Sequence, residues 1–152
     1  MLNQVSVLIV EDEPFIALDL ATAVEEARGK VIGPAGSVRE ALVLIEQNSV
    51  QVAILDVNLS DRDVAPVAEL LIEGGVPVIF YSGLDLPAAL RERYPSAPAY
   101  KKPTPSLRLL NELATLISGS RRALAGQLLQ MLSASSTTAP IPTTRMTSAT
   151  GS

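Results

Sequence analysis

Five polar side chains stand directly at the ends of short apolar runs in the sequence: Glu11, Asp12, Asp56, Ser82 and Lys102. If these runs are parallel strands, their carboxyl ends meet at one edge of a sheet and gather the five side chains in a single cleft. Three carboxylates so close together repel one another unless a cation joins them, and oxygen ligands with spare positions suit Mg²⁺. A carboxylate beside Mg²⁺ can attack a phosphorus centre while an ammonium and a hydroxyl donate to the phosphoryl oxygens. The pattern predicts a site that forms an aspartyl phosphate.

Each of these residues also has a simpler interpretation when it is taken alone. The acidic pair Glu11-Asp12 would favour the dipole of a following helix, and Asp56 would suit a turn. Ser82 could be an ordinary loop residue and Lys102 a solvated strand end. The joint occurrence of the five, in this order along successive strands, favours the phosphoryl-transfer interpretation.

The composition restricts the chemistry further. The 152 residues include neither Cys nor His, which excludes thiolate nucleophiles, imidazole ligands and a Ser-His-Asp triad built from this sequence. Hydrophobic residues make up 47% of the chain but aromatic residues only 3%, so the core must be aliphatic. A net charge of −4 argues against DNA as an obligate partner.

Targeting signals are not evident in the sequence. The first residues lack a basic segment followed by a long apolar stretch, and the apolar runs are far shorter than the roughly 20 residues that span a bilayer. We therefore expect a cytoplasmic protein without a membrane partner.

The elements that must position these residues alternate along the chain. The apolar runs predict strands at Val5–Val10, Val31–Ala35, Val52–Leu55, Pro77–Tyr81 and Ala99–Lys101. The segments between and after them have a helical period and predict helices at Glu13–Arg28, from Ser37, at Val64–Glu73, at Leu86–Arg93, and from Thr104-Pro105. Five successive β-α units predict an α/β protein with a parallel sheet that is covered by helices on both faces.

Several residues predict where the helices begin and end. Gly29 should stop the first helix. Ser37 should cap the second, with Glu40 completing a capping box. Thr104 and Pro105 should serve as the N-cap and first residue of the last helix.

The pattern divides the chain into three parts. Residues 1–118 hold the β-α units, and residues 119–132 predict a C-terminal helical extension with Leu124, Leu128 and Leu132 on one stripe. That stripe leaves open whether the chain forms a homodimer. Residues 133–152 are Ser, Thr, Ala and Pro without a period, which predicts a flexible tail.

The motifs VLIVEDEP, LDVNL, FYSG and KKP, in this order, resemble the receiver domain of bacterial two-component response regulators over about residues 4–118. The resemblance implies a flavodoxin-like (βα)5 receiver fold with a parallel five-stranded sheet in the order 2-1-3-4-5. It also implies that Asp56 is the phosphoacceptor, that Lys102 pairs with a phosphoryl oxygen, and that Ser82 is the switch hydroxyl. Lys101 is the runner-up for the Lys role.

The same resemblance implies a Mg²⁺ site. Asp12 and Asp56 would bind the ion directly, Glu11 would hold a metal-bound water, and the backbone carbonyl of Asn58 would supply a further ligand.

The motifs VIGPAGSVREAL, LDVNL and PVIFYSG also resemble a single-domain subgroup common in alphaproteobacteria, which is often paired with kinases of the HWE or related classes. Val78, Tyr81 and Ser82 depart from its PFxFATG-like motif. Ala99 stands where many receivers carry an aromatic, and Thr104 replaces the usual Phe after Lys-Pro.

These resemblances imply a stand-alone response regulator and not an enzyme with an external substrate. Its donor would be a sensor histidine kinase or a phosphotransfer protein, and its output would be protein-protein contact without DNA. A phosphate sink or relay and a scaffold without phosphorylation are alternatives. So is an Asp-nucleophile phosphatase of the haloacid-dehalogenase type, although Asn58 stands where that class has its second Asp.

Overall fold

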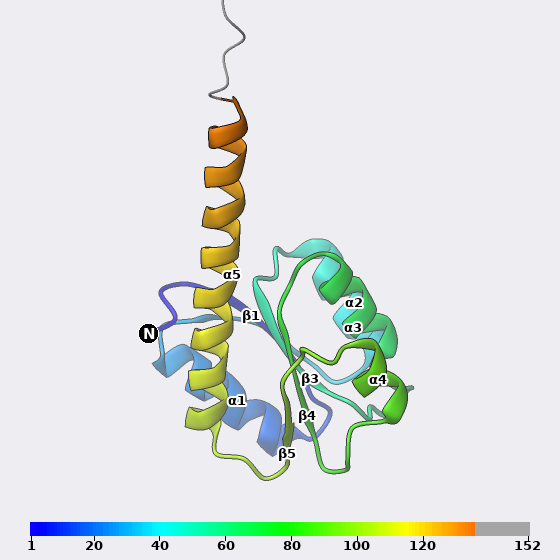
Figure 1. The fold of residues 1–152 in the computed structure, drawn as a ribbon. Helices are drawn as coiled ribbons and strands as arrows, with labels where there is room; N and C mark the ends of the chain where they lie inside the picture. The colour runs from blue at the N-terminus through cyan, green and yellow to red at the C-terminus, as the bar shows by residue number, and fades with distance from the viewer. Residues whose placement is uncertain (136–152) are drawn as a thin grey trace, which may run out of the picture. The chain divides into compact units, whose positions relative to one another are not determined.

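The structure of the chain, a computed structural model, describes residues 1–135 and alternates strands with helices (Figure 1). The strands are β1 (Ser6–Val10), β2 (Lys30–Ala35), β3 (Val52–Asp56), β4 (Val78–Ser82) and β5 (Ala99–Lys101). The helices are α1 (Pro14–Glu26), α2 (Val38–Gln47), α3 (Ala65–Glu73), α4 (Ala88–Arg93) and α5 (Ser106–Ser135).

The five strands form one sheet in the order β2-β1-β3-β4-β5, and every pair is parallel. This confirms the predicted α/β class, the parallel sheet and the strand order. Because the order reverses beside β1, the carboxyl ends of β1 and β3 flank the switch point where ligands bind in such sheets.

The two faces of the sheet are covered by different helices. Helices α2, α3 and α4 pack on one face, while α1 and the first half of α5 pack on the other (Figure 1). Within β3, for example, Ala53 and Leu55 belong to the first core and Val52 and Ile54 to the second. This period of two places aliphatic side chains on both faces, as buried parallel strands require.

The chain divides into two units after Ser120, and residues 121–135 are the described part of the second unit. Helix α5 runs from the first unit into the second without a break at residues 118–119. Residues 133–135 of the predicted tail are the end of α5, and residues 136–152 lie outside the described part of the chain. Within residues 1–135, no helix combines the length and hydropathy that a membrane crossing requires.

Helix α1 ends near Gly29 as predicted, but a different residue adopts the conformation that ends it. Arg28, not Gly29, has the positive φ of 66° that ends the helical path. Gly29 is needed for space, because a Cβ there would lie 2.8 Å from side-chain atoms of Leu2 and Val24. The prediction that Gly29 follows the first helix is therefore confirmed, but Gly29 is required there for lack of space and not for a positive φ.

Two acidic side chains and one hydroxyl hold the start of α2. The predicted cap is confirmed, since Ser37 Oγ accepts from the Glu40 amide at 3.1 Å. The Glu40 carboxylate accepts from Gly36, one residue earlier than a capping box requires. Asp61, from the loop after β3, accepts from the amides of Val38 (3.0 Å) and Arg39 (3.3 Å). The first of these bonds is the largest cause of the lowered pKa of Asp61.

The predicted cap of the last helix is wrong. Helix α5 begins at Ser106, and the Thr104 hydroxyl donates instead to the Lys101 carbonyl at 2.6 Å. Thr104 thus closes the turn that leaves β5, and this turn contains Lys102.

Candidate functional site

The predicted site residues lie at one edge of the sheet. Glu11 and Asp12 directly follow β1, Asp56 and Ser82 end β3 and β4, and Lys102 directly follows β5. The parallel register pairs Ser82 with Lys101, which brings the ends of these two strands level. The topology therefore gathers all five residues at the carboxyl edge.

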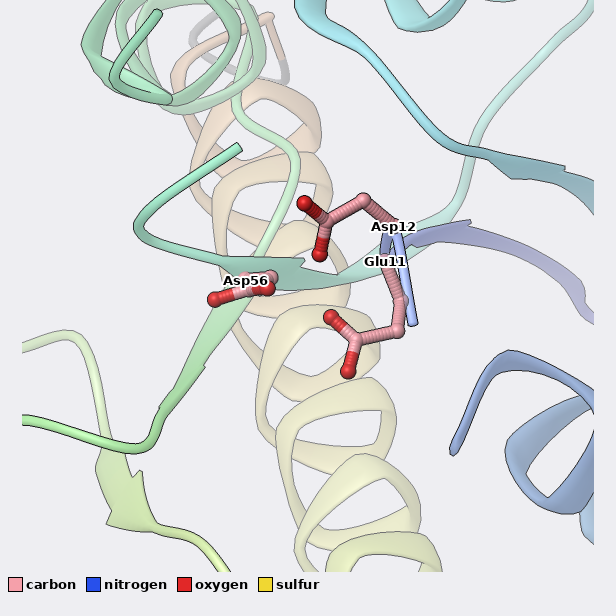
Figure 2. A group of neighbouring side chains, drawn as sticks. All are labelled: Glu11, Asp12 and Asp56. Atoms are coloured by element: carbon pink, nitrogen blue, oxygen red, sulfur yellow. The ribbon is translucent and has the colours of Figure 1, made fainter. Parts of the chain in front are cut away.

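The three carboxylates form a cluster between β1 and β3 (Figure 2). One oxygen from each of Glu11, Asp12 and Asp56 lies within 4.8 Å of the others. Glu11 and Asp56 are only 3% and 6% exposed, whereas Asp12 is exposed. Among residues 1–135, the buried polar side chains are Glu11, Asp56 and Ser82, so all of them belong to this site. Burial of charged groups on this scale requires partners.

Lys102 is the partner of the two buried acids. Its Nζ lies 2.5 Å from Glu11 Oε1 and 3.3 Å from Asp56 Oδ2. Lys101, the runner-up in the sequence, instead pairs at 3.5 Å with Asp85 in an exposed contact. The geometry therefore brings Lys102, and not Lys101, to the acids.

The electrostatics of the cluster are unbalanced. Burial, together with the hydrogen bond and charge of Asp56, raises the pKa of Glu11 from 4.5 to about 8, although Lys102 acts in the opposite direction. Burial by itself would lower the pKa of Lys102, but its hydrogen bonds and charge contacts with Glu11 and Asp56 raise it. A single ammonium faces two buried acids in the pocket, and a further positive charge there would favour their ionised forms.

The donor set fits a hard divalent cation. Glu11 Oε2 is buried and has no hydrogen-bond partner, which leaves a carboxylate oxygen able to accept from a ligand. The other oxygens come from Asp12, which is exposed, and Asp56. Carboxylates with room for water are the environment that Mg²⁺ prefers.

Ser82 and Asn58 lie beside the acids. The Ser82 hydroxyl accepts from the Leu84 amide at 3.3 Å, and the Ser82 carbonyl accepts from the Lys102 amide at 2.7 Å. Asn58 donates its amide to Asp56 Oδ1 at 3.3 Å. Their predicted roles, as switch hydroxyl and as carbonyl ligand, stay predictions.

One residue of the site surroundings was not predicted to matter there. The sequence marked Tyr81 only as a departure from a motif, but its ring centroid lies 5.4 Å from Lys102 Nζ. Its hydroxyl contacts the backbone of Thr104, just after Lys102. A Tyr directly before Ser82 was the available signal, although its partner could not be inferred from spacing.

Comparisons with known proteins agree with this geometry. A family model described as "Response regulator receiver domain" matches residues 7–98. The transcriptional regulatory protein PdtaR of Mycobacterium tuberculosis is 40% identical over 57 residues, which are 38% of this chain and 28% of PdtaR. The match thus spans little more than a quarter of that relative.

Solved structures with a similar fold extend the comparison to about three quarters of the chain. SdrG from Sphingomonas melonis Fr1 is 33% identical with a TM-score of 0.64, and the match covers 77% of this chain and 99% of SdrG. The receiver domain of the Francisella response regulator 1452 is 26% identical with a TM-score of 0.64, covering 76% of this chain and 98% of that domain.

Proposed function

The chain belongs to the response regulator receiver family of two-component signal transduction, and on that premise we propose that Asp56 accepts a phosphoryl group in a Mg²⁺-dependent reaction. The observation that carries this proposal is the placement of a buried Asp56 between an ammonium and two further acids. A carboxylate in such a pocket is held in position and shielded from bulk water, which favours its use as a nucleophile.

Each side chain has a proposed part in the transfer. An oxygen of Asp56 forms a bond to phosphorus while the bond from phosphorus to the donor nitrogen breaks, and the donor imidazole keeps that electron pair. Lys102 donates to a phosphoryl oxygen, and Ser82 supplies a hydroxyl at the same edge. Glu11, Asp12, Asp56 and the Asn58 carbonyl would hold Mg²⁺. When bound there, Mg²⁺ supplies charge neutralisation for the transferring group.

The donor and the output are other proteins. The family interacts with histidine kinases or phosphotransfer proteins, and the sequence contains no His that could carry the phosphoryl group itself. We propose a sensor histidine kinase, of the HWE or a related class, or a phosphotransfer protein as donor. Phosphorylation adds charge beside Lys102 and Ser82 and shifts the population of two surface states, which a downstream protein reads. The chain catalyses only its own phosphorylation and dephosphorylation.

Incubation with acetyl phosphate and Mg²⁺, followed by intact-mass measurement, tests the proposal. We expect one phosphoryl adduct that requires Mg²⁺ and is absent in Asp56→Asn. An adduct on the Asn variant would contradict the assignment of the acceptor. Steady turnover of p-nitrophenyl phosphate would instead support the phosphatase alternative.

The cytoplasmic location stays a prediction. The sequence leaves open whether the chain is a monomer or a homodimer formed through the leucine stripe of α5. The stripe residues Leu124 and Leu128 are 57% and 52% exposed. Light scattering over a range of protein concentrations tests dimerisation, with Leu124→Gln/Leu128→Gln as the variant that should remain monomeric.

A further inference from the structure

Tyr81 joins β4 to the turn that carries Lys102. It is only 6% exposed, and its side chain lies on the face of the sheet that α1 and α5 cover. Its hydroxyl accepts from the Thr104 amide at 3.1 Å and donates to the Thr104 carbonyl at 3.2 Å. Both backbone groups of one loop residue are therefore satisfied by a single phenol.

The turn that Tyr81 holds is fixed at three points around Lys102. Before Lys102, the Lys101 carbonyl accepts from the Thr104 hydroxyl at 2.6 Å. At Lys102 itself, the amide donates to the Ser82 carbonyl at 2.7 Å. After Lys102, the phenol of Tyr81 holds Thr104. Without the phenol, the segment after Lys102 loses its side-chain hydrogen bonds to the sheet core.

The ring of Tyr81 also lies near the Lys102 ammonium. The Lys102 Nζ lies 5.4 Å from the centroid of the Tyr81 ring, within the range over which a ring attracts a cation. The same nitrogen reaches Glu11 and Asp56. The long Lys side chain has many rotamers, so its reach to the acids depends on where its backbone and its stem are held.

We propose that Tyr81 is a positioning residue for Lys102, acting through its hydroxyl on the Thr104 backbone and through its ring beside the ammonium. This inference rests on the proposed function, because it assigns Tyr81 a part in phosphoryl transfer to Asp56. Tyr81 has no hydrogen bond to the three acids. Its loss should therefore slow transfer without weakening the cation site.

The variant Tyr81→Phe removes the hydroxyl and keeps the ring. Its matched control is Tyr100→Phe, because Tyr100 is the register partner of Tyr81 and its hydroxyl donates to Glu112 at 3.1 Å, away from the turn. We measure three quantities for each protein: the initial phosphorylation rate at saturating acetyl phosphate and Mg²⁺, the Kd for Mg²⁺ by calorimetry, and the free energy of unfolding in urea.

We expect Tyr81→Phe to phosphorylate on the order of 10-fold more slowly, since small misplacements of a reacting group carry costs of this kind. Its Kd for Mg²⁺ should stay within about twofold of the wild type. Tyr100→Phe should match the wild type within about twofold in both rate and Kd. The KM for acetyl phosphate should change less than the maximal rate in Tyr81→Phe.

A double-mutant cycle with Lys102→Ala separates positioning from a purely structural role. If Tyr81 acts through Lys102, Tyr81→Phe should cause no further slowing in the Lys102→Ala background. Additive slowing, or a wild-type rate in Tyr81→Phe alone, would overturn the inference and leave the proposed function standing. A wild-type protein that gains no adduct, or an adduct on Asp56→Asn, would overturn the proposed function and the inference with it.

Discussion

Lys102 lies closer to Glu11 than to the proposed acceptor, with 2.5 Å between Nζ and Glu11 Oε1 against 3.3 Å to Asp56 Oδ2. The Lys102 side chain is 16% exposed and the Glu11 side chain 1% exposed. Removal of one partner from a buried ion pair leaves the other charge without compensation, which costs more than the pair contributes. Lys102 should therefore matter for stability as well as for phosphoryl transfer.

Lys102→Met should lower the free energy of unfolding by about 3 kcal/mol in EDTA, because the buried acids Glu11 and Asp56 then lose the cation that they share. Urea denaturation followed by circular dichroism measures this change. Lys101→Met is the matched control: its pair with Asp85 is exposed on both sides, and such pairs contribute less than about 1 kcal/mol. Equal effects of the two substitutions would contradict the assignment of Lys102 to the site.

The stability of the protein in EDTA should fall as the pH rises from about 4.5 to about 8. Glu11 has its folded pKa raised from 4.5 to about 8 by burial and by Asp56. Between these values the folded state holds a proton that the unfolded state has released. The contribution is complete below the unfolded pKa and is lost as the pH passes through the folded pKa.

Glu11→Gln is the control for this pH dependence. It keeps a neutral side chain of similar size at every pH, so its free energy of unfolding should change less over the same range. Above pH 8 in EDTA, Glu11→Gln should be more stable than the wild type. Parallel pH profiles for the two proteins would show that another group is responsible.

Mg²⁺ should stabilise the folded protein, because the ligands of the acidic cluster come together only on folding. At a concentration of 100 times Kd, the expected gain is about 2.7 kcal/mol. Asp56→Asn removes one anionic ligand and should reduce the gain at the same Mg²⁺ concentration. Thermal unfolding with increasing Mg²⁺ measures both, and identical shifts in the two proteins would place the ion elsewhere.

Gly29→Ala should destabilise the protein by about 1 to 3 kcal/mol, as other overpacked cores do. The new Cβ would stand 2.8 Å from side-chain atoms of Leu2 and Val24, both of which are buried. Gly119→Ala is the opposite control, since its Cβ would meet no atom within 4 Å and it lies within α5. It should stabilise the helix by up to about 1 kcal/mol. Urea denaturation of both variants decides the comparison.

The sequence predicted the sheet and the site because both depend on local patterns. Aliphatic runs fix the buried strands, and polar residues such as Asp56 and Lys102 at their ends fix the edge where chemistry occurs. The contact between Tyr81 and Thr104 could not be predicted in this way, because it depends on where two separate segments meet in space. The cap at Thr104 was wrong for a related reason: α5 begins at Ser106, and the Thr104 hydroxyl lies in the preceding turn, where it donates to the Lys101 carbonyl.

Asp61 connects the loop after the acceptor residue to the start of α2 by hydrogen bonds. It stands five residues after Asp56 in the chain, yet it supplies acceptors to the Val38 and Arg39 amides at the start of α2. Any rearrangement of residues 57–61 must carry the beginning of that helix along or give up both bonds. A change in the loop after Asp56 is thereby linked to α2, which directly follows the edge strand β2.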